Sequence, residues 1–325
     1  MADVSAVIDA ALEISILGSF NRPGYLLRRR LFDWTDPAAG ALEGQTVMIT
    51  GPTSGLGRAA AIALAGLGAR LVLVGRNETR LSRVRDDLIA DSREDRYRIV
   101  VADLSSLADA RHAVESIMAT EDRLDVIVDS AGAIHARRTT TDDGLEATFA
   151  TMVVCPFVLI VGLLPLLEQH GGGRVISVVS GGMYAQALDL DDLQSTRGEF
   201  NGTLAYARAK RAATALVREW PRRLGARPVR INAMHPGWAD TPGLAHALPG
   251  FHRLMGPMLR TPAEGVDTIT WLAADPSAGS RGGQLFLDRR SRPFDRIPAT
   301  RSTRDDRQRL WDMVVDLSGV GDPTA

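Results

Sequence analysis

Short apolar segments alternate with longer amphipathic segments along most of the chain. A short apolar run that ends at glycine or a polar residue is typical of a buried strand, and apolar residues spaced three and four apart are typical of helices. The pattern predicts strands at 46–49, 70–74, 98–102, 124–128, 174–179, 229–232 and 284–287. It predicts helices between them at 57–68, 78–91, 106–119, 144–169 (with a bend at Pro156) and 204–223.

This alternation predicts the fold class. Continuously apolar strands that alternate with helices form a mostly parallel sheet with helices on both faces. Right-handed crossovers then give a doubly wound, Rossmann-type α/β sheet of about seven strands. Ligands of such sheets bind beyond the carboxyl ends of the strands, so the loops that follow the strands are where function is expected.

Two terminal extensions flank the predicted sheet. We divide the chain into an N-terminal extension (1–43), a domain that contains the predicted sheet (44–290) and a C-terminal extension (291–325). An amphipathic helix is predicted over 2–17, with a break at 21–24. Its polar face is acidic, and anionic lipid would repel it, so we expect this helix to pack on the domain or on a second subunit rather than on a membrane. The C-terminal extension contains a second amphipathic helix, over 304–317.

Composition excludes several classes of protein. The chain has 325 residues, of which 45% are apolar and 24% charged, with a net charge of −1. This balance is typical of a globular protein and shows no basic excess for nucleic acid. The single cysteine, Cys155, excludes an intrachain disulfide and a cysteine-rich metal site. The apolar run 153–167 is short for a membrane span, and acidic residues occupy the N-terminus where a signal peptide would be apolar. We therefore expect a soluble, cytoplasmic protein that binds no metal.

A glycine-rich turn follows the first predicted strand. It reads Thr50-Gly51-Pro52-Thr53-Ser54-Gly55-Leu56-Gly57 and opens the first predicted helix. Glycines at this spacing permit a tight turn and let the backbone approach a pyrophosphate, which the helix N-terminus attracts. The motif predicts a dinucleotide site, and an ordinary glycine-rich turn is the alternative.

A tyrosine and a lysine lie four residues apart on the helix predicted over 204–223. Residues Tyr206 and Lys210 therefore share a face, where the ammonium group is expected to lower the pKa of the phenol and make it a general acid–base. Lys210 is the only lysine among 38 basic residues, which argues against a merely solvated side chain. Ser180, just past the fifth strand, could donate a hydrogen bond to a carbonyl oxygen; a loop serine is the alternative.

These motifs together resemble the classical short-chain dehydrogenase/reductase family over about residues 44–290. The resemblance implies that Tyr206 exchanges a proton with the substrate oxygen, that Lys210 lowers its pKa and binds the nicotinamide ribose, and that Ser180 orients the carbonyl. A nicotinamide cofactor then transfers the hydride. Other stretches look closest to the branch around dehydrogenase/reductase member twelve, namely 180–183, 192–194, 235–242 and 249–251.

The resemblance also implies a set of cofactor-binding residues. Arg76 stands after Gly75, where an acidic residue would favour NAD, and suits the 2′-phosphate of NADPH. NADPH is therefore the expected cofactor, and NAD is the other possibility. In the alternative interpretation, the Arg76 side chain stacks on the adenine or faces water. The expected cofactor-binding residues are Gly51, Thr53, Ser54, Gly55, Leu56, Gly57, Arg76, Asn77, Asp103, Leu104, Ala131, Gly132, Tyr206, Lys210, Pro236, Gly237 and Thr241.

The chain departs from the family pattern at two places. Met152 stands where an asparagine completes a catalytic tetrad, and Asp129-Ser130 replaces two asparagines. Two interpretations are open. In the first, the proton relay runs through a backbone carbonyl and activity is retained; in the second, the enzyme is slow, specialised or degraded. A bulky apolar substrate is expected against a wall of Met152, Gly182, Met183, Tyr184, Trp238, His246 and Phe251, with packing beneath loops as the alternative.

The sequence thus predicts an NADPH-preferring oxidoreductase that interconverts a carbonyl and an alcohol on an apolar small molecule, as a homo-oligomer. Two other interpretations stay open. The first is a cofactor-binding sensor or scaffold without redox turnover, and the second is an epimerase or dehydratase that retains its cofactor.

Overall fold

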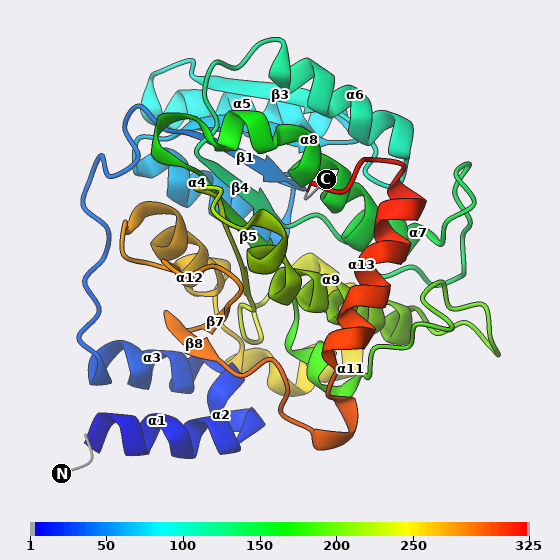
Figure 1. Cartoon of the computed structure of the whole chain (residues 1–325). Helices are drawn as coiled ribbons and strands as arrows, with labels where there is room; N and C mark the ends of the chain where they lie inside the picture. Colours follow the sequence, from blue (N-terminus) through cyan, green and yellow to red (C-terminus); the bar gives the residue numbers. More distant parts are fainter. Residues whose placement is uncertain (1–3, 324–325) are drawn as a thin grey trace.

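The computed structural model describes residues 4–323, and its core is one eight-stranded sheet (Figure 1). The strand order is β3-β2-β1-β4-β5-β6-β7-β8, and every neighbouring pair is parallel except β7 and β8. The strands are β1 (Thr46–Thr50), β2 (Arg70–Gly75), β3 (Tyr97–Val101), β4 (Val126–Asp129), β5 (Arg174–Val178), β6 (Arg230–Met234), β7 (Leu285–Leu287) and β8 (Arg290–Arg292).

Helices cover both faces of the sheet, as the continuously apolar strands predict. Successive residues of β1 divide between the two faces: Met48 belongs to one apolar cluster, and Val47 and Ile49 belong to the other. The cluster of Met48 lies under α6 (Leu107–Met118), α8 (Cys155–Leu167) and α9 (Gly202–Leu224). The other cluster lies under α4 (Gly55–Gly66), α5 (Glu78–Ser92) and α12 (Pro262–Ala274). The doubly wound fold class is confirmed.

The sheet has one strand more than predicted. The seven predicted strands are present, and β8 follows β7 through a two-residue turn in which Asp288 and Arg289 adopt left-handed φ angles of 55° and 54°. The pattern of apolar residues could not reveal β8, because it is three residues long and reads Arg-Ser-Arg.

The long helix predicted over 144–169 is divided into three parts. It begins as α7 (Ala147–Phe149), continues as a π-helical turn (Ala150–Val154) and ends as α8. The irregular turn therefore lies just before Pro156, where the sequence predicts a bend. Among the described residues, 147–167 is the one helical stretch long and apolar enough to cross a membrane, and 78% of its most apolar window is buried in the core.

The other helices lie around the sheet. The C-terminal helix α13 (Arg304–Ser318) packs the buried Trp311 against the rings of Trp220 and Phe157, at centroid distances of 4.7 and 5.1 Å. The remaining α-helices are α1 (Val4–Ile14), α2 (Ile16–Phe20), α3 (Arg22–Leu31), α10 (Pro242–Ala247) and α11 (Pro249–Met255). Short 3₁₀ helices span Gln169–Gly171, Gly181–Ala185, Gly256–Met258 and Pro298–Thr300.

The N-terminal extension folds differently from the prediction. The helix expected over 2–17 ends at Ile14, and residues 2 and 3 lie outside the described part. The expected break at 21–24 is instead the start of α3. Asn21 caps this helix by accepting a hydrogen bond from the Gly24 amide at 2.8 Å, and Pro23 lies in the first turn, where its missing N–H costs nothing.

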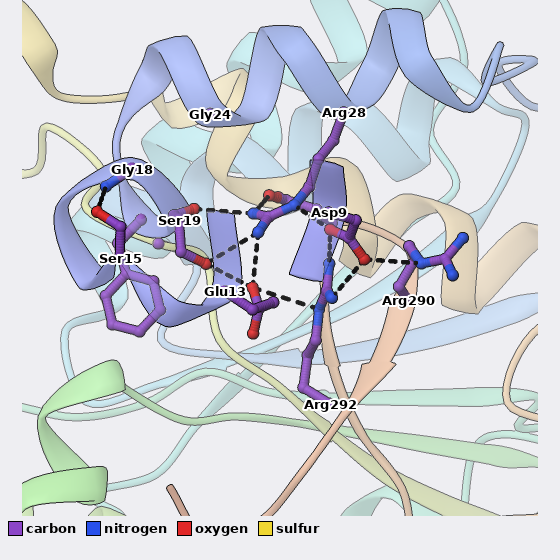
Figure 2. Close-up of polar contacts among 12 residues, drawn as sticks. Asp9, Glu13, Ser15, Gly18, Ser19, Gly24, Arg28, Arg290 and Arg292 are labelled. Atoms are coloured by element: carbon purple, nitrogen blue, oxygen red, sulfur yellow. Dashed lines mark hydrogen bonds and ion pairs between the residues drawn. The ribbon is translucent and has the colours of Figure 1, made fainter. Parts of the chain in front are cut away.

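The amphipathic helix α1 turns its acidic face toward the domain. The acidic residues Asp9 and Glu13 point toward the domain, where they meet arginines (Figure 2). Helix α1 thus contacts the rest of the protein through its acidic face, because Arg28 and Arg292 pair with the carboxylate of Asp9. The exposed apolar residues of α1 and α2 are Val4, Val7, Ile14, Ile16 and Leu17.

Arg28 lies at the centre of this buried network. Its side chain is fully buried, and its guanidinium pairs with Asp9 at 2.7 Å, Glu13 at 2.6 Å and Asp288 at 2.7 Å. Asp288 pairs on its other side with the buried Arg260, at 2.5 Å. The extension is thus joined to the sheet by ion pairs that water does not screen, which makes the loss of any one partner costly.

We predict that Arg28→Met lowers the free energy of unfolding by about 3–5 kcal/mol, since it leaves buried carboxylates without their shared cation. Arg58→Met, which removes an exposed pair with Asp87, is the control and should cost less than about 1 kcal/mol. Urea denaturation at neutral pH measures both. Equal small losses for the two variants would contradict the importance of the network.

Candidate cofactor and catalytic site

The loops that follow β1, β4 and β6 meet at the carboxyl edge of the sheet. A β-carbon added to Gly51 would lie 3.0 Å from the Cα of Ala131, and one added to Gly55 would lie 3.5 Å from Thr241. Three separate segments of the chain therefore bring together residues that are predicted to bind one cofactor. Gly132, Pro236 and Gly237 follow in the same two loops.

The turn between β1 and α4 depends on its glycines. Gly51 and Gly55 adopt left-handed φ angles of 68° and 51°, and a β-carbon on Gly57 would lie 2.2 Å from the carbonyl oxygen of Gly51. A side chain at position 57 would force α4 away from β1. These glycines therefore bring the N-terminus of α4 close to the end of the strand.

The N-terminus of α4 is open to an anion. Within the described chain, the Ser54 side chain makes no hydrogen bond that caps this helix, although it occupies the N-cap position. The first-turn N–H groups thus remain available to a phosphate, and the helix dipole favours one. This geometry fits a dinucleotide pyrophosphate, with Thr53 and Leu56 on either side of the turn.

Thr50 connects this turn to the end of β4. Its hydroxyl oxygen accepts hydrogen bonds from the amides of Ser130 and Ala131, each at 3.0 Å, and its proton points to Asp129 at 3.3 Å. Ser130 in turn donates to the carbonyl of Thr50 at 2.5 Å. The sequence prediction included neither Thr50 nor Asp129 among the site residues, because their contacts join strands that are far apart in the chain.

The ends of β2 and β3 bound the other side of the site. Arg76 is exposed and, among the described residues, makes no hydrogen bond or ion pair, so it is free to contact a ligand. Asn77 caps α5 by accepting from the Arg80 amide at 2.9 Å. Asp103 accepts from the amide and hydroxyl of Ser105, and Leu104 is buried.

The three predicted catalytic residues lie together. Ser180 forms the N-cap of the 3₁₀ helix Gly181–Ala185, and its side chain lies close enough to the phenol of Tyr206 on α9 to act on the pKa of that phenol. Lys210, one turn further along α9, donates from Nζ to the carbonyl of Val178 at 2.8 Å. Its Nζ lies 5.9 Å from the centre of the Tyr206 ring.

The pKa of Tyr206 differs from the sequence prediction. Burial raises the pKa of the phenol above its usual value of 10, and the Ser180 side chain opposes this rise only in part. The predicted lowering by Lys210 does not dominate, because desolvation disfavours the phenolate and also lowers the pKa of Lys210 itself. In this structure, the phenol therefore holds its proton at neutral pH.

Asp129 is a buried carboxyl group beside Lys210. Thr50 and Ser177 both donate hydrogen bonds to it at 3.3 Å, one to each carboxylate oxygen. Burial raises the pKa of Asp129, and the charge of Lys210 opposes this rise; in return, the carboxylate opposes the lowering of the lysine pKa. Two oxygens that both accept hydrogen bonds suit the ionised form.

Met152 lies in the π-helical turn and is buried against this carboxylate. It lines a small cavity of about 20 Å³ together with Asp129, Ser177 and apolar residues of α8 and α9. That volume is enough for one water molecule. Pro156 has no N–H to donate to the carbonyl of Met152, four residues before it, which leaves that carbonyl outside the regular helical pattern.

The residues expected to form the substrate wall fall into two groups. Met152, Met183 and Tyr184 are buried in the core, and the Tyr184 hydroxyl donates to the carbonyl of Pro293 at 3.1 Å. Partly exposed residues form the second group: the rings of Trp238 and Phe251 meet edge to face at 5.1 Å, and Gly182 and His246 are exposed. The second group alone can meet a substrate without a rearrangement of the core.

Comparison with known proteins agrees with this geometry. The family model described as short chain dehydrogenase matches residues 45–249. Dehydrogenase/reductase SDR family member 12 from Bos taurus is 37% identical over 277 residues, which cover 85% of this chain and 86% of the relative. Retinol dehydrogenase 14 from Mus musculus is 31% identical and covers 98% of this chain and 99% of its own.

A solved structure shows the same fold. The short chain dehydrogenase from Salmonella enterica subsp. enterica serovar Typhi str. CT18 superposes with a TM-score of 0.64 at 24% identity, over 78% of this chain and 98% of that one. Its likeness concerns the sheet and its helices. The family model and the sequence relatives extend the likeness to the motifs that meet at the sheet edge, and the chain therefore belongs to the short chain dehydrogenase family of NAD(P)-dependent oxidoreductases.

Proposed function

We propose that the protein is an NADPH-preferring oxidoreductase that interconverts a carbonyl and an alcohol on an apolar small molecule. The observation that carries this proposal is that Ser180, Tyr206 and Lys210 lie together. Asp129, whose charge acts on Lys210, also accepts a hydrogen bond from Thr50, where the glycine turn begins. A proton donor, a second hydrogen-bond donor and a fixed cation thus stand next to a cradle that fits a dinucleotide.

The protonated phenol suits the reductive direction. A carbonyl oxygen that gains negative charge needs a proton, and Tyr206 holds one at neutral pH because burial raises its pKa. The Ser180 hydroxyl, which lies near that phenol, would donate to the same oxygen and orient it. When bound, the cofactor supplies the hydride.

Lys210 supplies positive charge next to Tyr206, and Asp129 helps it to stay charged. A buried ammonium tends to lose its proton, and the neighbouring carboxylate opposes this loss. The carbonyl of Met152, whose usual helical donor is missing at Pro156, could hold a water molecule that passes protons to the lysine. The cavity beside Met152 supports this interpretation of the missing tetrad asparagine.

The preference for NADPH rests on Arg76. An exposed guanidinium without another partner in the described chain can make charge-assisted hydrogen bonds to a 2′-phosphate. An Escherichia coli CFT073 protein of this fold, with a TM-score of 0.63, is complexed with NADPH, which supports the proposal at the level of the fold.

An apolar substrate is supported by the exposed aromatic edge of the site and by the names of relatives. The partly exposed pair Trp238 and Phe251 offers an apolar surface near the catalytic loops. The relatives include retinol dehydrogenase 14 and a polyprenol dehydrogenase from Mus musculus, 32% identical over 91% of this chain. Both names denote apolar alcohols.

We predict that Tyr206→Phe lowers kcat for NADPH-dependent carbonyl reduction about 10²–10⁴-fold, since it removes the proton donor. The Kd for NADPH, from cofactor fluorescence, should stay within a few fold. A panel of apolar ketones and aldehydes provides the substrates. Unchanged biological activity in this variant would favour a sensor or scaffold, and turnover without net NADPH consumption would favour an epimerase or dehydratase.

We predict that Arg76→Ala raises the Kd for NADPH about tenfold or more and leaves the Kd for NADH unchanged, because only NADPH carries the 2′-phosphate. Arg83→Ala, which removes an exposed arginine further along α5, is the control. Fluorescence titration with each cofactor measures the effect. An equal loss for both cofactors would show that Arg76 contacts adenine instead.

We predict that Asp129→Asn lowers the pKa of Lys210, because the carboxylate is what opposes the effect of burial on this lysine. Since Lys210 is the only lysine, a protein labelled with ¹⁵N-lysine gives one side-chain NMR signal to titrate. Asp125→Asn changes a buried carboxylate at the other end of β4 and should leave this pKa unchanged. No difference between the two variants would mean that Asp129 carries no charge.

A further inference from the structure

We propose that the N-terminal extension completes the active site, and that Phe20 is a positioning residue for the two loops on either side of the catalytic centre. This inference rests on the proposed function. Phe20, the last residue of α2, is buried and lies between the loop that begins at Ser180 and the loop that begins at Pro236.

The ring of Phe20 contacts the residue after the catalytic serine. A β-carbon on Gly181 would lie 2.6 Å from a ring carbon of Phe20, so glycine lets the loop rest directly on the ring. The same ring stacks with Tyr184 at a centroid distance of 6.5 Å, at the far end of the 3₁₀ helix that Ser180 caps. Phe20 thus supports both ends of the catalytic serine loop.

The backbone of Phe20 holds the second loop. Its carbonyl oxygen accepts hydrogen bonds from the amide of Trp238 at 2.8 Å and from Nε of Arg260 at 3.1 Å. A β-carbon on Gly237 would lie 2.6 Å from this oxygen and 2.5 Å from the guanidinium of Arg260. The Pro236–Gly237 turn, expected to meet the nicotinamide, therefore rests directly on the N-terminal segment.

Histidine and arginine side chains close the space around the ring. His235, fully buried at the end of β6, meets Phe20 edge to face at 4.7 Å, and Arg296 lies over the ring at 5.1 Å. Burial and four neighbouring arginines hold the pKa of His235 well below its usual value, so the imidazole is neutral. His235 is therefore a packing residue of this contact, and Tyr206 remains the general acid.

The buried ion pairs fix the position of Phe20. The carbonyl of Ser19, the residue before it, accepts hydrogen bonds at 3.0 Å from both Arg28 and Arg260. Both arginines also pair with Asp288, so the backbone at 19–20 is held between two guanidinium groups. The polar network on α1 and α3 (Figure 2) thus ends at the two loops of the active site.

A displacement of Phe20 should act on chemistry rather than on folding alone. Ser180 must stay within hydrogen-bond reach of the substrate oxygen, and the Pro236–Gly237 turn must stay at the cofactor. A misplacement of about 1 Å can cost about a hundredfold in rate. The extension would therefore set kcat and cofactor affinity through a contact that lies outside the matched family model, which begins at residue 45.

The test is a double-mutant cycle on Phe20 and Gly181. Gly181→Ala directs a methyl group into the ring, and we expect kcat/KM for carbonyl reduction to fall about tenfold or more. Phe20→Ala should lower kcat and raise the Kd for NADPH in folded protein. In the double variant, Phe20→Ala makes room for the methyl group, so kcat/KM should exceed that of Gly181→Ala by about threefold or more.

Trp34→Leu is the control for a purely structural effect. Trp34 packs on Tyr25 within the same extension, so its loss should lower the unfolding temperature and leave kcat and the NADPH Kd unchanged. If Phe20→Ala behaves like this control, or if the double variant is no better than Gly181→Ala, the positioning role is overturned. Wild-type protein that binds no NADPH would instead overturn the proposed function, and this inference with it.

Discussion

A carboxylate that is buried away from water must be paired with positive charge, and Asp288 meets this requirement with two arginines from distant parts of the chain. It stands in the left-handed turn between β7 and β8, at the edge of the sheet. Arg28 reaches it from the N-terminal extension, and Arg260 reaches it from the segment before α12. The loss of either arginine would leave the buried carboxylate with only part of its compensating charge. The extension, the sheet edge and the Pro236–Gly237 turn are consequently held as one unit.

The parts of this protein that sequence could predict are those determined by local pattern. The strands from β1 to β7 are apolar runs, and the glycine turn and the pair Tyr206–Lys210 have fixed short spacings, so each is visible within a few residues. The orientation of α1 could not be predicted in the same way. Its acidic face turns inward because it pairs with Arg292 and Arg296. These two residues lie almost 300 positions later in the chain. Local amphipathicity alone favours the opposite orientation.

The pKa values of the proposed catalytic side chains could likewise not be predicted from sequence spacing. Sequence spacing indicates that Lys210 lies near Tyr206, but it does not show how thoroughly each group is desolvated. The structure adds the burial, which acts against the charged form of both side chains, and it adds Asp129 from the neighbouring strand.

The burial of Lys210 has a consequence for the chemistry of the whole surface. This side chain is 3% exposed and donates to Val178, and it is the only lysine side chain of the protein. Reagents that acylate lysine amines therefore find their side-chain target only when α9 moves away from the end of β5. The rate of lysine acylation therefore measures how often this part of the core opens, and the measurement needs no substrate.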